Sequence, residues 1–173
     1  MAKRQDRDPQ PPAPPRFERR LRFGRAQLVG VGLLALLPLA ALTGVLGAAE
    51  REASASSGAL TLEARYASTI HYKGSHTFVF DLRNDGEGPL HDARLRVDEA
   101  YLSRFEGVRF TPPVVRLDPR HAEVALGDIE AGATRRVLLE LQASEYGRPQ
   151  GSVVALSADS GEARVQLSTL VLP

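Results

Sequence analysis

The stretch FVFDLRNDGEGPLHDARLRV, residues 78–97, contains two segments in which apolar and polar residues alternate. Apolar side chains occupy every second position on either side of its middle: Phe78, Phe80, Leu82, Ala93, Leu95 and Val97. The middle, residues 84–89, holds Asn-Asp-Gly, a second glycine and a proline, which are typical of a turn. Because a period of two places alternate side chains on one face, the stretch predicts two half-buried β-strands.

The same alternation recurs through residues 59–173. Further apolar-polar runs lie at 60–66, 124–126, 137–141, 154–158 and 165–171, and turn signals separate them at 130–132, 146–149 and 159–161. About seven strands in a body of this size predict an all-β fold, an Ig-like antiparallel β-sandwich.

One connection, residues 98–107, has a different pattern. It starts with Asp98, a residue type that caps helices, and ends with Gly107. We expect a short helical turn that closes one end of the sandwich. Its aromatic residues Tyr101 and Phe105, together with Phe110, are predicted to cap the core, and a partner-binding surface is the alternative.

The segments FVFDLRNDGEGPLHDARLRV and LGDIEAGATRRVLLEL resemble bacterial Ig-like modules of the cell-adhesion-related and fibronectin type III kind. In such modules a strand ends in Asn-x-Gly, and a later turn containing glycine precedes another strand. The resemblance covers residues 78–141. It implies binding, spacing or scaffolding, and it carries over no catalytic residue.

A long apolar segment, which includes LVGVGLLALLPLAALTGVLGAA at 28–49, precedes this body. The 24 residues between Arg25 and Glu50 are uncharged. As a helix they would reach roughly 36 Å, against about 30 Å of bilayer hydrocarbon. We therefore predict a transmembrane helix at 26–49. A cleaved signal peptide, with small residues at 47–49, and a buried soluble helix are the alternatives; the length and the lack of charge disfavour both.

Charge predicts the orientation of this helix. Residues 1–25 carry eight basic and three acidic side chains, and the rest of the chain has a net charge of −4. The arginines just before the helix, which set topology or contact lipid headgroups, are Arg16, Arg19, Arg20, Arg22 and Arg25. The positive-inside rule places 1–25 in the cytoplasm and the body outside the cytoplasmic membrane, in the periplasm or beyond the cell.

Three further assignments concern the N-terminal third of the chain. Residues 1–25 are proline-rich and basic, which predicts a disordered tail; docking of its Pro-x-x-Pro spacings to a partner is an alternative. Ala40, Gly44 and Ala48 lie four apart, a spacing that favours helix packing and a homodimer, although chance explains it too. Residues 50–58 are polar and rich in serine, so we expect a linker.

No catalytic chemistry is evident from motifs. Cysteine is absent, the only methionine is Met1, and no nucleophile elbow, phosphate loop or zinc-protease motif occurs. We predict no enzyme activity, no cofactor, no small-molecule substrate and no nucleic-acid partner. His71 and His76 are weak candidates for metal ligands.

Lysine occurs twice against twenty arginines, a usage typical of bacteria with GC-rich genomes. The sequence as a whole predicts a single-pass membrane protein whose interaction domain serves another membrane or envelope protein. The alternative is a metal-handling or enzymatic envelope accessory that uses the loop between His71 and His76.

Overall fold

The computed structural model describes Gly30, Leu34 and residues 49–173. Within these residues, no helix has the length and hydropathy needed to cross a bilayer. The expected cytoplasmic tail at 1–25, with its arginines, lies outside the described residues. So do most of the expected transmembrane helix at 26–49 and its packing positions Ala40, Gly44 and Ala48.

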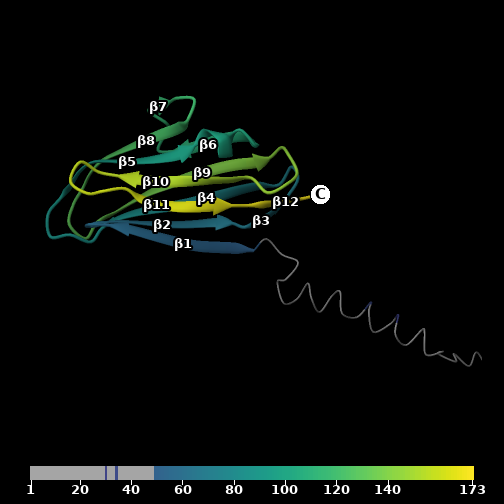
Figure 1. The fold of residues 1–173 in the computed structure, drawn as a ribbon, viewed down its shortest axis with the longest axis horizontal. Helices are drawn as coiled ribbons and strands as arrows, with labels where there is room; N and C mark the ends of the chain where they lie inside the picture. Colours follow the sequence, from purple (N-terminus) through teal and green to yellow (C-terminus); the bar gives the residue numbers. More distant parts are fainter. Residues whose placement is uncertain (1–29, 31–33, 35–48) are drawn as a thin grey trace, which may run out of the picture. The chain divides into compact units, whose positions relative to one another are not determined.

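Residues 50–172 form twelve strands and one short helix (Figure 1). In chain order they are β1 Glu50–Ser57, β2 Leu60–Ala67, β3 Thr69–His71, β4 Ser75–Asn84, β5 Leu90–Asp98, α2 Glu99–Leu102, β6 Phe105–Thr111, β7 Arg116–Leu117, β8 His121–Ile129, β9 Thr134–Ala143, β10 Gln150–Leu156, β11 Ala163–Ser168 and β12 Leu170–Leu172.

Two five-stranded antiparallel sheets form the sandwich. One has the order β1-β2-β4-β9-β6 and the other the order β11-β10-β5-β8-β7. A parallel pair, β3 with β12, lies at one end. The prediction of an all-β antiparallel sandwich is confirmed, but the described part holds twelve strands where we expected about seven. Of the additional strands, β3, β7 and β12 are short, β1 buries small side chains, and β6 is interrupted by a register shift, so hydrophobic periodicity does not mark them.

The alternating residues form the core as predicted, except in the run at 154–158. Side chains that face inward from both sheets are 0–4% exposed: Leu60, Leu62, Ala64, Tyr66, Phe78, Phe80, Leu82, Ala93, Leu95, Val97, Ala122, Val124, Val137, Leu139, Leu141, Val153, Ala155, Ala163, Val165 and Leu167. Such burial supplies the main favourable term in folding. The period of two identified the inner face of the other long strands, but for β10 it was one residue out of phase: Val153 and Ala155 face the core, whereas Leu156 is half-buried and Ala158 is exposed. The consecutive apolar residues Val153, Val154 and Ala155 leave the phase of this strand undetermined by the pattern alone.

The turn after β4 is fastened by Asn84, whose side chain is fully buried. Its amide nitrogen donates to the carbonyl oxygens of Gly88 at 2.8 Å and Ile129 at 2.9 Å. Its side-chain oxygen accepts from the backbone N–H of Gly86 at 2.9 Å. One side chain thus shapes the turn and ties it to the end of β8 in the opposite sheet.

The prediction of a linker at 50–58 is wrong for residues 50–57. Glu50–Ser57 form β1, which pairs with β2 along its whole length, from Glu50 opposite Ala67 to Ser57 opposite Leu60. Ala53 and Ala55 are half-buried against the core, whereas the residues between them are exposed. Their small side chains give a weak periodic signal, and charges at the start of β1 are typical of an edge strand.

The helical turn expected at 98–107 is only partly correct. Helix α2 spans four residues, and Asp98 makes no capping hydrogen bond. The Asp98 carboxylate instead accepts from the backbone N–H of Ser152 at 2.6 Å and from its hydroxyl at 2.9 Å. Gly107 does not end a helix: it lies in β6 with φ of 62°, where the pairing of β6 with β9 shifts register. Contacts between distant residues decide both outcomes.

Candidate interaction surface

The two sides of the sandwich are closed differently. On one side β1, the last strand of its sheet, contacts β11, the last strand of the other. On the opposite side the last strands are β6 and β7. A groove lies between these two edge strands, and helix α2 lines one end of it. We call it the β6–β7 groove.

The β6–β7 groove is mainly apolar. It encloses about 300 Å³ and is lined by Glu99, Leu102, Ser103, Phe105, Val108, Phe110, Val114, Leu117 and Ala122. This volume lies at the lower limit of small-molecule pockets, which span roughly 300–1,000 Å³. Its size suits one or two apolar side chains of a partner.

Exposed apolar side chains surround this groove. Val108, Val115 and Leu117 are 37%, 62% and 68% exposed. They account for half of the large exposed hydrophobic residues in the described part of the chain; Tyr72 and Tyr146 are two of the others. Single exposed apolar residues are common on protein surfaces, but Val108 and Leu117 line the groove together and Val115 follows the lining residue Val114, so this face is the candidate interaction surface.

The aromatic residues predicted to cap the core, with a partner-binding surface as the alternative, are all buried, but they differ in whether they reach the groove. Tyr101 does not reach it: the side chain is fully buried, and its hydroxyl is hydrogen-bonded to that of Thr169 at 2.8 Å. The Thr169 hydroxyl donates in turn to the Ala67 carbonyl oxygen. Burial raises the pKa of Tyr101 far above its ordinary value. Phe105 and Phe110 are 6% and 8% exposed, and both line the groove.

Sequence reasoning missed Val108, Val115 and Leu117. They lie in a bulged strand and in the connection that follows it, where no regular period reveals the inward face. A usable signal was present, because TPPVVRL at 111–117 combines apolar residues with prolines and has no amphipathic period. Such a segment is expected at an edge.

One charged residue, Glu99, is among those that line the β6–β7 groove. The arginines of the two edge strands lie opposite acids: Arg109 of β6 is opposite Glu140 on β9, and Arg116 of β7 is opposite Glu123 on β8. The groove therefore offers a partner mainly apolar contacts.

The edge of β6 is available for strand pairing. Strand β6 pairs with β9 on one side and is the last strand of its sheet on the other. An edge strand presents unpaired N–H and C=O groups to an added strand. The register shift between Glu106 and Arg109 breaks this edge into short pieces, which limits pairing to a short extended segment.

The segment between His71 and His76 forms a tight turn. His71 ends β3 and His76 lies in β4, and the N–H of Gly74 donates to the His71 carbonyl oxygen at 2.9 Å. Partial burial, followed by repulsion from His71, lowers the pKa of His76. Within residues 49–173 no group of three or more His, Asp or Glu side chains is placed to hold a metal ion. The turn therefore supplies two neighbouring imidazoles without a third ligand.

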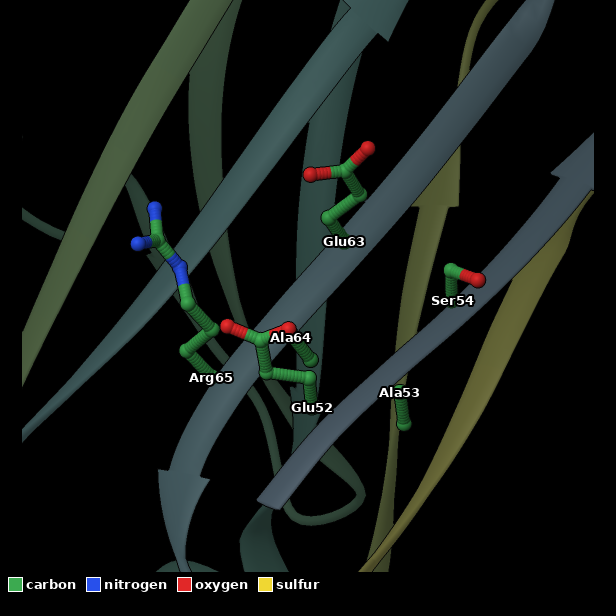
Figure 2. Close-up of a pocket in the computed structure, with 6 residues that line it drawn as sticks. All are labelled: Glu52, Ala53, Ser54, Glu63, Ala64 and Arg65. Atoms are coloured by element: carbon green, nitrogen blue, oxygen red, sulfur yellow. The ribbon is translucent and has the colours of Figure 1, made fainter. Parts of the chain in front are cut away.

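A shallow polar depression lies over β1 and β2 (Figure 2). It is lined by Glu52, Ala53, Ser54, Glu63, Ala64 and Arg65. Figure 2 shows Arg65 extending away from β1, in agreement with its ion pair to Asp81 at 2.8 Å on β4. The remaining polar groups are two carboxylates and the Ser54 hydroxyl; Ser54 lies opposite Glu63, but no hydrogen bond joins its hydroxyl to either carboxylate. This set does not form a catalytic constellation.

Two buried carboxylates lie under pairs of arginines on the outer faces. Asp81 accepts from Arg65 and, at 2.7 and 3.0 Å, from Arg136. Hydrogen bonding from Arg136, opposed by burial, holds the pKa of Asp81 below its usual range. Burial by itself would raise the pKa of Glu123, but Arg96 and Arg94 outweigh it and lower that pKa. These groups stabilise the sheets.

The ion pairs predict that acid destabilises the fold. Because the pKa of Asp81 is lower in the folded than in the unfolded protein, its contribution is present at neutral pH and is lost as pH falls below about 4. We expect the free energy of unfolding of Asp81→Asn to change less between neutral and acid pH than that of the wild type. Urea unfolding followed by circular dichroism measures this change. Glu162→Gln, at an exposed pair, should retain the wild-type pH dependence, and equal slopes for all three proteins would contradict the prediction.

No protein-family model matches the chain, and no curated protein matches it. Solved structures similar to it are sandwiches of low identity. A solution structure of the CARDB domain of a Pyrococcus furiosus protein has 7% identity, covers 66% of this chain and 94% of its own, and has a TM-score of 0.46. A crystal structure of that domain has 10% identity, 67% and 89% coverage and a TM-score of 0.43. BslA, a bacterial hydrophobin, has 12% identity, 68% and 98% coverage and a TM-score of 0.44. The chain is thus similar to CARDB domains, which have an Ig-like β-sandwich fold.

Proposed function

We propose that this protein is a non-catalytic interaction module, anchored by residues 26–49 and presented outside the cytoplasmic membrane to another membrane or envelope protein. The observation that carries the proposal is the β6–β7 groove with its exposed rim of Val108, Val115 and Leu117. Burial of such side chains supplies binding energy at roughly 25 cal/mol per Å².

The anchor is supported by length and by charge. The uncharged residues between Arg25 and Glu50 suffice for one membrane crossing, and the basic residues before them favour a cytoplasmic N-terminus. Strand β1 begins at Glu50, directly after this segment. A retained anchor would hold the sandwich close to the bilayer, so its partner would be found there too.

The groove favours an extended segment as the bound element. A short strand could pair with the edge of β6 while an apolar side chain enters the groove between Phe105 and Leu117. This geometry is a means of recognition, and it requires no chemical step.

Substitution of Leu117 tests the groove. Leu117→Asp places a charge at the apolar rim. Partner recovered with the full-length protein in mild detergent should fall about tenfold or more, because loss of a hot-spot contact costs about 2 kcal/mol or more and each 1.4 kcal/mol is about tenfold in affinity. Leu117 is largely exposed, so the fold should persist. Val115→Asp provides an independent variant, and Gln166→Asp on the outer face of β11 is the matched control.

Site-specific photocrosslinking identifies what occupies the groove. A photoreactive phenylalanine at Val108 should give a crosslink to one defined envelope protein, and Leu117→Asp should abolish it. The same group at Gln166 should not give that product. If both positions crosslink the same proteins equally, the groove is not the recognition site.

A further inference from the structure

Besides the groove, an exposed aromatic pair lies at the end of the sandwich that the chain enters. The Ala49 carbonyl oxygen accepts from the N–H of Ser68 at 2.7 Å and from its hydroxyl at 2.8 Å. Strand β1 starts at this end, and β3, β12 and the C-terminus lie there too (Figure 1). Residues 26–49 are therefore covalently continuous with this end, and no linker separates them from it.

Tyr72 and Tyr146 form the pair. Their ring centroids are 4.5 Å apart with planes 34° from parallel, and the residues are 37% and 61% exposed. The Lys73 ammonium lies 5.3 Å from the centre of the Tyr72 ring. Exposed rings with polar hydroxyls suit the boundary between water and lipid, where tyrosine is enriched.

The pair has a fixed position on the domain. The Tyr72 N–H donates to the Leu172 carbonyl oxygen at 2.8 Å, and Gly147 pairs with Val171. Both tyrosines are thus held by β12 and its neighbours. Because these loops are fastened, burying the rings would cost little additional conformational entropy.

The charges at this end nearly cancel. Lys73 contacts Glu106 at 3.1 Å, Arg104 pairs with Glu145, and Arg148 pairs with no other described residue. Electrostatic attraction to anionic lipid therefore cannot be the main source of affinity, and insertion of the rings must supply it. A zwitterionic bilayer is the surface that these groups match.

We propose that the Tyr72–Tyr146 end of the sandwich rests in the headgroup layer of the membrane that holds residues 26–49. The inference rests on the proposed anchor, which brings this end to the bilayer. Docking adds a second contact to the covalent one. It fixes the tilt of the sandwich and therefore the direction in which the β6–β7 groove faces.

Fluorescence of the full-length protein tests the docking, because the chain contains no tryptophan. Tyr146→Trp, reconstituted in phosphatidylcholine vesicles, should show blue-shifted emission and lose intensity when lipids brominated near the headgroup are included. Tyr72→Trp is a second reporter, should the first variant fail to fold. Glu87→Trp, in the turn at the opposite end, is the control and should show neither effect.

Flotation of the same vesicles after alkaline extraction separates the two proposals. Protein that floats while the indole of Tyr146→Trp or Tyr72→Trp is quenched supports the docking. Protein that floats while these indoles are quenched no more than that of Glu87→Trp overturns the docking and leaves the anchor intact. Protein that does not float overturns the anchor, and with it the docking.

Discussion

Replacement of Asn84 by alanine should lower the free energy of unfolding by about 3 kcal/mol, because a net loss of about 1 kcal/mol per hydrogen bond adds to the cost of leaving buried groups unpaired. The side chain makes three hydrogen bonds, to Gly86, Gly88 and Ile129. The bond to Ile129 is wholly buried, and alanine leaves that carbonyl oxygen without its donor. Since small domains are stable by about 5–15 kcal/mol, the effect is a large share of the total.

Urea unfolding followed by far-ultraviolet circular dichroism measures the effect on Asn84→Ala. The matched control is Arg83→Ala, the preceding residue on the same strand. Its side chain forms a solvent-exposed ion pair with Asp85, which contributes little to stability because water screens it. If the two variants lose the same stability, then Asn84 does not fasten the turn to the opposite sheet.

Asn84 also shows how far the sequence could predict the fold. The Asn-Asp-Gly composition marked a turn after residue 83, and the alternation around it marked two strands and their inner faces. The bond from Asn84 to Ile129 joins residues 45 positions apart. No local pattern encodes a partner at that separation, so sequence reasoning found the turn but not its attachment.

The errors have related physical causes. Strand β1 was assigned as a linker because Ala53 and Ala55 bury little apolar surface, and pairing with β2 decides its conformation. The sequence predicts Asp98 as a helix cap because its residue type favours that role. In the structure the Asp98 carboxylate instead accepts a hydrogen bond from the backbone N–H of Ser152 on a distant strand. In each case a tertiary contact overrides a local preference.

The candidate surface was harder to predict than the fold. The β6–β7 groove combines α2, β6, β8 and the connection around β7, which share no motif. The sequence marked Phe105 and Phe110, which line the groove, but also Tyr101, which belongs to the core. An aromatic residue at an expected surface position cannot be separated from one that caps a core until its neighbours are known.

The two proposals share one end of the domain, because β1 begins at Glu50, directly after the proposed anchor at 26–49. An anchor that holds the sandwich near the bilayer would reduce the entropy that partner binding must overcome, provided that the partner lies in the same membrane.

Replacement of Gly151 by alanine should destabilise the domain by about 3 kcal/mol, at the upper end of the cost of overpacking a core. A Cβ atom built at Gly151 would collide with the Cβ atom of Tyr101 and would lie 3.0 Å from its Cγ. These atoms are fixed near the backbone of α2, so the ring cannot rotate away from the new methyl group. The helix itself would have to move.

Movement of α2 should also affect recognition, because Glu99 and Leu102 of this helix line the β6–β7 groove. Gly151→Ala should therefore lower both the midpoint of urea unfolding and the crosslinking from position 108 under conditions where the variant stays folded. Gly88→Ala is the control: a Cβ atom there meets no atom within 4 Å, so stability and crosslinking should stay near wild type. Unchanged crosslinking in a folded but destabilised Gly151→Ala would show that the groove does not depend on the position of α2. Loss of both stability and crosslinking would link the packing of Tyr101 in the core to the shape of the recognition surface.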